Sequence, residues 1–336
     1  MGSEATSGVT VGGQDRPRSR LVAVSLSPSI DVTYVVDSFV VGEIHRTEQV
    51  HRVPGGKGFN VARAAHALGA DVVATGVLGG DTGAWMVQAL ARTGMRLRPV
   101  AGNQPTRTCV AVADAATGSL TEVYEPAPRI EPRAWGTLVA TVGELSREHA
   151  SWVSLSGSLP PGPVPQALAD LIRVAQEGGA KVAVDTHSTA LAAAVGAGPD
   201  LIKVNVREAA SVLYGPDHLL EPHPLAPLVL AQGLLDRSPR TELAIVTAGA
   251  DGAVALTRAG RILRAQLDVV GPYPVGSGDS FLGGLLHALT RRPDDLDGAL
   301  TLATAAGAAN ALMPGAGRLD LDRLPQLTEA VVLTAR

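Results

Sequence analysis

Short apolar runs alternate along this chain with longer stretches whose apolar residues recur at helical spacing. We interpret each short run, rich in Val, Ile and Leu, as a buried strand, because strands covered on both faces lose the polar alternation of exposed ones. The predicted strands are Leu21–Leu26, Asp71–Leu78, Trp152–Leu155, Lys181–Val184, Leu201–Val204 and Leu243–Thr247.

Amphipathic periodicity predicts helices between these strands. From Pro163 onward, apolar residues at i, i+3, i+4, i+7, i+8 and i+11, beginning with Val164, form one face. A second helix is predicted to start near Asn60 and to stop at Gly69. Repetition of strand, helix and strand predicts an α/β fold, with a doubly wound, mainly parallel sheet flanked by helices.

Two segments interrupt this alternation, at about residues 31–53 and 106–128. Both contain strand-forming residues without an intervening helix, and Asp114–Gly118 has the composition of a hairpin turn. We therefore expect a small β-sheet outside the main layer. One of its faces would be uncovered unless it closes over a ligand as a lid or packs on a second subunit.

We expect a single domain at 21–336, although the length of 336 residues alone would also allow two smaller cores. Hydrophobic residues make up 46% of the chain and aromatic residues only 3%, so the core must consist mainly of Ala, Val and Leu. Residues 1–20 lack an apolar cluster, and we expect them to be a disordered tail. Every apolar stretch is shorter than the roughly eighteen residues of a membrane span, so no membrane association is expected.

Charge and cysteine content narrow the choice of partner. The net charge is −4 with both signs interleaved, which argues against nucleic acid or an anionic membrane as the main partner and favours a small molecule. The one cysteine, Cys109, cannot form an internal disulfide, and no Cys/His group has zinc spacing. A cytoplasmic location is expected.

A glycine-rich turn followed by an apolar helical run is the first candidate site. Gly276, Ser277 and Gly278 would allow successive amide hydrogens to converge, and a helix starting there adds the positive end of its dipole, which attracts anions. Asp279 would be repelled by such an anion unless it takes a proton from an attacking hydroxyl, as in phosphoryl transfer. The alternative for the turn alone is a glycine turn with an Asp N-cap.

Two further motifs lie upstream. Gly55, Gly56 and Lys57 begin a Gly-Gly-Lys-Gly cluster in which a ligand could touch backbone while the lysine meets a negative group; the alternative is a loop with Asn60 as N-cap. The cluster lacks the ending of a Walker loop. Asp31 follows the first strand, where ligands bind in parallel sheets, and could accept hydrogen bonds from two sugar hydroxyls or be an ordinary turn residue.

Together these motifs resemble the ribokinase-like carbohydrate kinases, the PfkB family. The family's two signatures are similar to Gly55–Ala62 and Gly276–Asp279, and Thr106–Thr108 and Ser156–Gly162 resemble its sugar-phosphate branch of 1-phosphofructokinases, tagatose-6-phosphate kinases and minor 6-phosphofructokinases. The resemblance implies ATP-dependent phosphorylation of a ketohexose phosphate, fructose 1-phosphate or tagatose 6-phosphate, to the bisphosphate. It also implies a homodimer clasped through the lid.

The resemblance implies a role for individual residues. Asp279 would be the base, and the amides of 276–279 would form the anion hole. The residues implied to bind the sugar phosphate are Asp31, Gly55, Gly56, Lys57, Asn60, Arg107 and Ser158. Among these, Lys57 and Arg107 would meet the phosphate already on the substrate, and Arg107 could bind it through two parallel hydrogen bonds.

The nucleotide side is implied in the same way. The residues assigned to ATP are Lys203, Asn205, Thr247, Gly249, Gly252 and Asn310, the last at the adenine wall. Asn205 and Glu208 would also order Mg²⁺ through its waters, with few direct protein ligands. Their spacing equally fits a helix capping box. The turn at Thr247–Gly252 could be a simple hairpin.

Three alternatives remain at this point. The acceptor could be fructose 6-phosphate, or an unphosphorylated sugar or nucleoside, although such a sugar gives Lys57 and Arg107 no phosphate to bind. A protein of another class, a sugar-phosphate sensor, could keep the fold without the chemistry. A sensor has no reason to retain Asp279.

Overall fold

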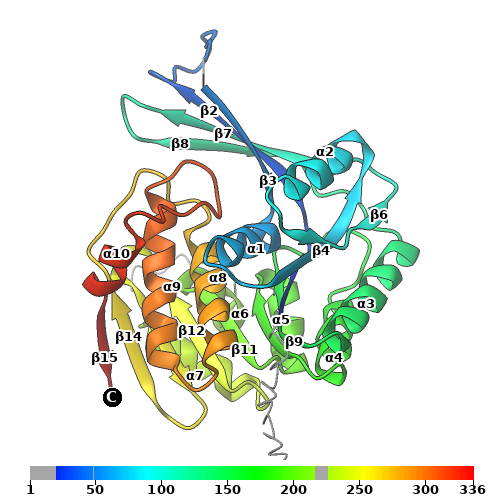
Figure 1. The fold of residues 1–336 in the computed structure, drawn as a ribbon, viewed down its shortest axis with the longest axis vertical. Helices are drawn as coiled ribbons and strands as arrows, with labels where there is room; N and C mark the ends of the chain where they lie inside the picture. The colour runs from blue at the N-terminus through cyan, green and yellow to red at the C-terminus, as the bar shows by residue number, and fades with distance from the viewer. Residues whose placement is uncertain (1–19, 48, 216–225) are drawn as a thin grey trace, which may run out of the picture.

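The computed structural model describes residues 20–47, 49–215 and 226–336 (Figure 1). The expected tail at 1–20 therefore lies outside the described residues, apart from Arg20, which begins the first strand, β1 (Arg20–Ser25). In this part of the chain, no helix is both long enough and apolar enough to cross a membrane.

Eleven of the described strands form one large sheet. Its order is β15-β14-β13-β12-β11-β10-β9-β1-β4-β5, with β6 beside β4. The strands from β12 to β5 run parallel, and β13, β14 and β15 add antiparallel strands at one edge. Besides β1, the strands are β4 (Val72–Gly79), β5 (Arg96–Leu97), β6 (Val100–Gly102), β9 (Ala150–Ser156), β10 (Lys181–Asp185), β11 (Leu201–Asn205), β12 (Leu243–Thr247), β13 (Ala253–Thr257), β14 (Ile262–Gln266) and β15 (Val332–Ala335).

The topology confirms the predicted doubly wound sheet. β1 lies between β4 and β9, so the chain builds the sheet outward in both directions from β1. All six predicted strands are present, each within two residues of its expected bounds. A crevice forms where the winding reverses, at the carboxyl ends of the strands, and this is where ligands bind in such sheets.

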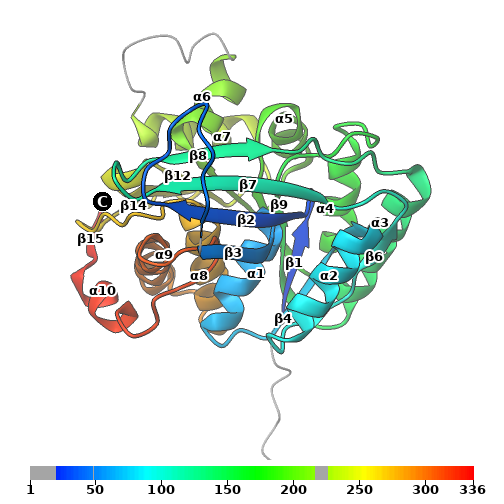
Figure 2. The ribbon, with the colours of Figure 1, turned by 90° about the horizontal axis from the view of Figure 1, so that it is seen from above.

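Helices cover both faces of the sheet (Figure 2). One face packs against α1, α2, α8 and α9, and the other against α3 to α7, because alternate residues of each strand point to opposite sides. The helices are α1 (Lys57–Ala67), α2 (Gly80–Ala91), α3 (Pro132–Arg147), α4 (Ala167–Glu177), α5 (Ser188–Ala197), α6 (Val206–Tyr214), α7 (Pro227–Arg237), α8 (Ser277–Arg291), α9 (Leu296–Ala311) and α10 (Leu324–Ala330).

Two helix starts differ from the prediction. α4 begins at Ala167 rather than near Pro163, because Val164 precedes a proline and is disfavoured in helical conformation. α1 begins at Lys57 rather than near Asn60, with Gly56 as N-cap at φ +91°, and Gly69 follows its end at φ +87° as predicted. Asn60 is therefore a buried residue inside the helix and not its cap.

The small sheet is present as a separate four-stranded layer. Its order is β3-β2-β7-β8, and β7 and β8 form the expected hairpin, whose turn is held by the Asp114 carboxylate accepting the amides of Ala116 and Thr117. The strands are β2 (Ser29–Val36), β3 (Gln49–Gly55), β7 (Arg107–Asp114) and β8 (Leu120–Tyr124). Figures 1 and 2 show this sheet extending over one end of the main layer.

Candidate active site

A cavity of about 830 Å³ lies between the small sheet and the main layer. It is lined by residues from all of the motifs singled out in the sequence. Of the predicted site residues, those that line it are Asp31, Gly56, Lys57, Asn60, Arg107, Ser158, Lys203, Asn205, Glu208, Thr247, Gly249, Gly252, Gly276, Ser277, Gly278 and Asp279. Gly55 and Asn310 do not line it.

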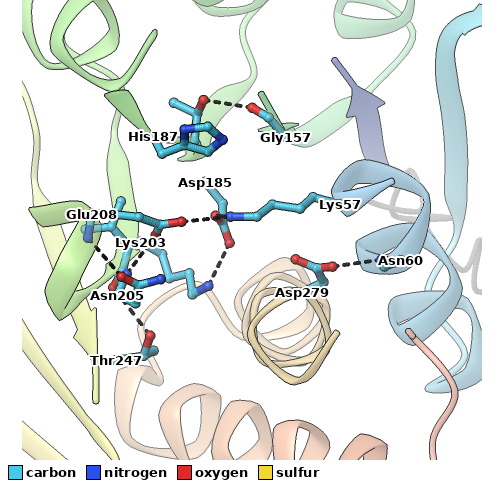
Figure 3. Close-up of polar contacts among 12 residues, drawn as sticks. Lys57, Asn60, Gly157, Asp185, His187, Lys203, Asn205, Glu208, Thr247 and Asp279 are labelled. Carbon is cyan, nitrogen blue, oxygen red and sulfur yellow. Dashed lines mark hydrogen bonds and ion pairs between the residues drawn. The ribbon is translucent and has the colours of Figure 1, made fainter. Parts of the chain in front are cut away.

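Asp279 lies in the first turn of α8, whose N-cap is Gly276 in the left-handed region at φ +85°. Its side chain is 6% exposed, and Asn60 of α1 donates Nδ2 to Oδ2 at 2.8 Å (Figure 3). The Ser277 amide donates to Pro274 at 3.1 Å, whereas the Gly278 and Asp279 amides lie at a helix start, where N–H groups lack a carbonyl one turn back. The carboxyl group of Asp279 therefore lies in the same helical turn as the amides that are suited to bind an anion.

Burial raises the pKa of Asp279 to about 7, and the nearby negative charge of Asp185 adds to the rise. Lys57, the Asn60 hydrogen bond and Lys203 act in the opposite direction. A carboxyl group with a pKa close to neutrality can both take a proton and release it, which is the property required of a general base.

Two lysines share one carboxylate beside Asp279. Lys57 Nζ lies 2.8 Å from Asp185 Oδ1 and 3.1 Å from Glu208 Oε1, and Lys203 Nζ lies 2.6 Å from Asp185 Oδ2 (Figure 3). These pairs raise the pKa of Lys57 although burial alone would lower it. The Lys57 ammonium, expected to meet a substrate phosphate, is thus already bonded to two carboxylates.

Asp185 was missed as a site residue. It is fully buried at the end of β10, and although burial alone would raise its pKa, Lys203 and Lys57 lower it to about 2. The adjacent backbone is fixed by Gly157, whose amide donates to Asp185 O at 2.9 Å and whose carbonyl accepts Thr186 Oγ1 at 2.7 Å. A carboxylate directly after a buried parallel strand was the signal that could have identified it.

Asp31 lies on β2, facing the cavity. Its Oδ1 accepts the Ser29 hydroxyl at 2.7 Å, and burial raises the pKa of its carboxyl group. Gly55 does not line the cavity. Only glycine fits at this position, because a Cβ would lie 2.0 Å from the Asp31 Cγ. Gly55 thus makes room for the carboxylate rather than contacting a ligand.

Arg107 begins β7, one strand away from Asp31. Its Nη1 donates to Glu125 O at 3.3 Å, while its Nε is buried without a hydrogen-bond partner among the described residues. Cys109 and Tyr124 line the same wall. A guanidinium that lines a cavity is suited to bind an anion from the ligand.

Arg63, on α1, is a second residue that the sequence reasoning missed. Its guanidinium donates to Asn60 Oδ1 at 3.2 Å and to the carbonyl oxygens of Pro54 and Ala316. Burial lowers its pKa to about 10. Because Arg63 occupies the amide oxygen of Asn60, the Nδ2 group must face Asp279. The i, i+3 spacing of Asn60 and Arg63 was the available signal.

The nucleotide side of the cavity follows β11 and β12. Asn205 and Glu208 form the expected capping box of α6, with the Glu208 amide donating to Asn205 Oδ1 at 2.8 Å and Oε2 of Glu208 accepting the Asn205 amide at 2.9 Å. Gly249 begins a short 3₁₀ turn after Thr247 and Gly252 follows its end, both at positive φ. The structure thus confirms the structural use of Asn205.

Asn310 has a position different from the one expected. It has no exposed surface, and its side chain bonds protein groups on all sides. Gly307, which the resemblance also implied for the adenine wall, does line the cavity, together with Ala308 and Ala311 of the same helix. Within the described residues, no group of three or more His, Cys, Asp or Glu side chains could hold a metal ion.

This arrangement defines a phosphoryl-transfer class of site. One end of the cavity offers a carboxylate and a guanidinium, the other offers glycine turns, and a carboxyl group with a near-neutral pKa lies at a helix N-terminus between them. Two ligands can therefore meet at Asp279 while the helix start binds the group that passes between them.

Comparisons with known proteins agree with this class. Residues 18–322 match the pfkB family carbohydrate kinases, so the chain belongs to this family. It is 33% identical over 275 residues to the 1-phosphofructokinase of Rhodobacter capsulatus, covering 81% of this chain and 84% of that protein. It is 28% identical over 316 residues to a tagatose-6-phosphate kinase of Staphylococcus epidermidis, covering 93% and 98%.

Among solved structures, the chain is similar to the tetrameric inhibited form of phosphofructokinase-2 from Escherichia coli. The TM-score is 0.82 at 26% identity, and the match covers 93% of this chain and 98% of that one. The protein is a sugar-phosphate kinase of the PfkB family, with the mixed α/β fold and separate small sheet predicted from its sequence.

Proposed function

We propose that this kinase transfers the γ-phosphoryl group of ATP to a ketohexose phosphate, fructose 1-phosphate or tagatose 6-phosphate, producing the bisphosphate and ADP. The observation that carries the proposal is the guanidinium of Arg107, a cation that lines the same cavity as Asp31 and Asp279. A substrate that already bears a phosphate supplies an anion for this cation to bind.

In the proposed reaction, Asp279 takes the proton from the acceptor hydroxyl as its oxygen bonds to the γ-phosphorus. The bond from that phosphorus to the β–γ bridging oxygen breaks, and ADP leaves with the electron pair. The Gly278 and Asp279 amides stabilise the charge on the phosphoryl oxygens. Asp31 accepts hydrogen bonds from sugar hydroxyls and thereby holds the acceptor oxygen toward Asp279.

The ion pairs of Lys57 favour a role for this residue other than binding the substrate phosphate. With its ammonium bonded to Asp185 and Glu208, we assign it to orienting those carboxylates and lowering the pKa of Asp279, leaving Arg107 as the main phosphate ligand. Lys203 lies at the anion hole, since a Cβ on Gly278 would be 2.9 Å from its Nζ. It is suited to contact the transferring phosphate.

Magnesium is part of the proposal because the charge of ATP must be neutralised during transfer. The residues present fit an ion held chiefly by the nucleotide phosphates, since Glu208 is the carboxylate on this side of the cavity and is already paired with Lys57. Glu208 and Asn205 would contact its waters.

Turnover with a panel of acceptors tests the proposal. Fructose, fructose 1-phosphate, fructose 6-phosphate and tagatose 6-phosphate should be compared at equal ATP and Mg²⁺, with ADP release as readout. We expect kcat/KM to be highest for fructose 1-phosphate or tagatose 6-phosphate. A preference for free fructose would contradict the proposal, and absence of turnover with every acceptor would favour a sensor.

We further propose a cytoplasmic homodimer formed through the small sheet. The registers place Val35, Ala111, Ala113 and Leu120 on the same side of this sheet as Asp31, beyond the cavity and partly exposed. Partly exposed apolar side chains on one face of a projecting sheet favour burial against a second subunit.

A further inference from the structure

The turn that leads into α8 is attached to α9 by the side chain of Asn310. Its Nδ2 donates to Val275 O at 2.9 Å and lies 3.4 Å from both Tyr273 O and Ser277 Oγ. Its Oδ1 accepts the Ser280 hydroxyl at 3.0 Å. The amide therefore contacts the backbone before Gly276 and the first helical turn after it.

The same amide also holds the segment that packs against Gly276. Asn310 Oδ1 accepts the Gly317 amide at 2.7 Å, and a Cβ on Gly276 would lie 2.5 Å from the Ala316 Cβ. Gly276 thus has a fixed neighbour on its open side. Its left-handed conformation sets the direction of the amides that follow it.

Only a carboxamide meets the demands of this position. Carbonyl oxygens on one side require a donor with two hydrogens, and the Ser280 hydroxyl and Gly317 amide on the other side require an acceptor. With no exposed surface, Asn310 has no water to replace a missing partner. A carboxylate of the same shape would place oxygen against oxygen at Val275.

We propose that Asn310 is a positioning residue for phosphoryl transfer: it fixes the Gly276 turn so that the Gly278 and Asp279 amides point at the transferring phosphate. This inference rests on the proposed function of that turn as the anion hole. Asn310 touches no reacting atom, and it acts through Val275, Ser280 and Gly317. Its loss should therefore lower kcat while leaving sugar binding intact.

Two variants and one control test this role. Asn310→Asp keeps the shape of the side chain but removes the two Nδ2 hydrogens. Asn310→Ser shortens the side chain, and it is measured in place of the first variant if that variant does not fold. Leu327→Ala is the control, because Leu327 is buried between α10 and α9 and its truncation destabilises the same region without touching the turn.

We expect kcat of both Asn310 variants to fall by about 100-fold, the effect of a small misplacement at a reacting centre. The dissociation constant of the sugar phosphate, measured without nucleotide, should stay within about threefold of the wild-type value, because its proposed contacts come from β2 and β7. In the Leu327→Ala control, kcat should also stay within about threefold of wild type. Folded Asn310 variants with kcat equally close to wild type would overturn the proposal.

Amide hydrogen exchange tests the positioning role of Asn310 independently of the proposed kinase reaction. The amides of residues 276–280 should exchange faster in the Asn310 variants than in wild type, without ligand, and should be unchanged in Leu327→Ala. If wild type phosphorylates no sugar phosphate, the proposed function fails and exchange alone decides. Unchanged exchange in a folded Asn310 variant would overturn the positioning role.

Discussion

Asp279 is buried, yet the role of base that we propose for it requires an ionised carboxyl group. Burial and Asp185 raise its pKa, whereas Lys57, Asn60 and Lys203 lower it, and the balance lies at about 7. In a solvated carboxyl group the pKa would be near 3.8, too low to retain a proton taken from a sugar hydroxyl. The surroundings of Asp279 therefore set its chemistry.

Replacing this base tests the assignment. We expect Asp279→Asn to lower kcat by about 10²–10⁴-fold, the contribution of a general base, with sugar-phosphate affinity nearly unchanged. Rates with saturating ATP and isothermal titration of the sugar phosphate measure the two effects. A variant that keeps a tenth of wild-type kcat would exclude Asp279 as the base.

The same variant should be more stable than wild type at high pH. Because the folded pKa of about 7 exceeds the unfolded value of 3.8, the stability that proton binding contributes is present below pH 3.8 and is lost as the pH rises to 7. Above pH 7 the buried charge is a net cost. Asp279→Asn removes it, and we expect the free energy of unfolding at pH 8 to rise by up to about 4 kcal/mol. Urea unfolding measures it; equal stability at pH 8 would contradict this account.

The pH dependence of the free enzyme follows from the same value. We expect log kcat/KM to rise with pH with unit slope and to level off above about pH 7, as Asp279 ionises. Asp185→Asn should move this limb to lower pH, because it removes the negative charge that raises the pKa of Asp279. A shift to higher pH would show that Asp185 acts otherwise.

Asp185→Asn should also destabilise the protein, since the buried Lys203 and the partly buried Lys57 lose their shared carboxylate. We expect a loss of about 3–5 kcal/mol in the free energy of unfolding, as for breaking a buried ion pair. Denaturant unfolding at pH 8 measures this loss. Asp170→Asn is the matched control, because it breaks an exposed ion pair with Arg173 on α4. Equal losses in the two variants would contradict the importance of burial.

Strands β2 and β7 together form the cavity wall at which we propose that the sugar phosphate binds. They run parallel in register, with Ser29 opposite Arg107 and Asp31 opposite Cys109, so the carboxylate and the guanidinium project from the same face of the sheet. Since β3 leads directly into the N-cap of α1, movement of this wall would also move Asn60. The small sheet would thus link the proposed sugar binding to Asp279, which accepts a hydrogen bond from Asn60.

Arg107 tests this element. Arg107→Gln should raise KM for the phosphorylated sugar by about 10–100-fold, the loss of charged hydrogen bonds, with a smaller loss for Arg107→Lys. KM for ATP should not change. Arg52→Gln is the control, because Arg52 is an exposed residue of β3 in the same sheet that does not line the cavity. Equal effects of the two Gln variants would contradict a specific phosphate contact.

The molecule as a whole combines a rigid main layer with a projecting sheet, and the cavity lies between them. The proposed dimer buries the apolar part of that sheet. We expect a dimer mass by light scattering at micromolar concentration, and a monomer for Ala113→Arg, which places a cation at the partly exposed face. Ala115→Arg, in the exposed turn of the same hairpin, should remain dimeric. A monomeric wild type would contradict the proposal.

Local sequence signals were sufficient where the structure depends on near neighbours. Apolar runs such as Leu243–Thr247 predicted the parallel strands, and the Asn205–Glu208 spacing predicted a capping box. The start of α1 was predicted too late, because its N-cap is a glycine without a capping side chain and Asn60 resembled one. The helix start predicted at Gly276–Asp279 is present, and this turn lines the cavity.

The sequence by itself determined the fold class, the family and most residues that line the cavity, since these depend on periodicity and on motifs of adjacent residues. Only the tertiary structure decided their partners and charges. Lys57 meets Asp185 across 128 positions of the chain, and Arg63 meets Ala316 across 253. Burial and such distant neighbours fix the pKa of Asp279 and the role of Asn310, and neither is encoded in local sequence.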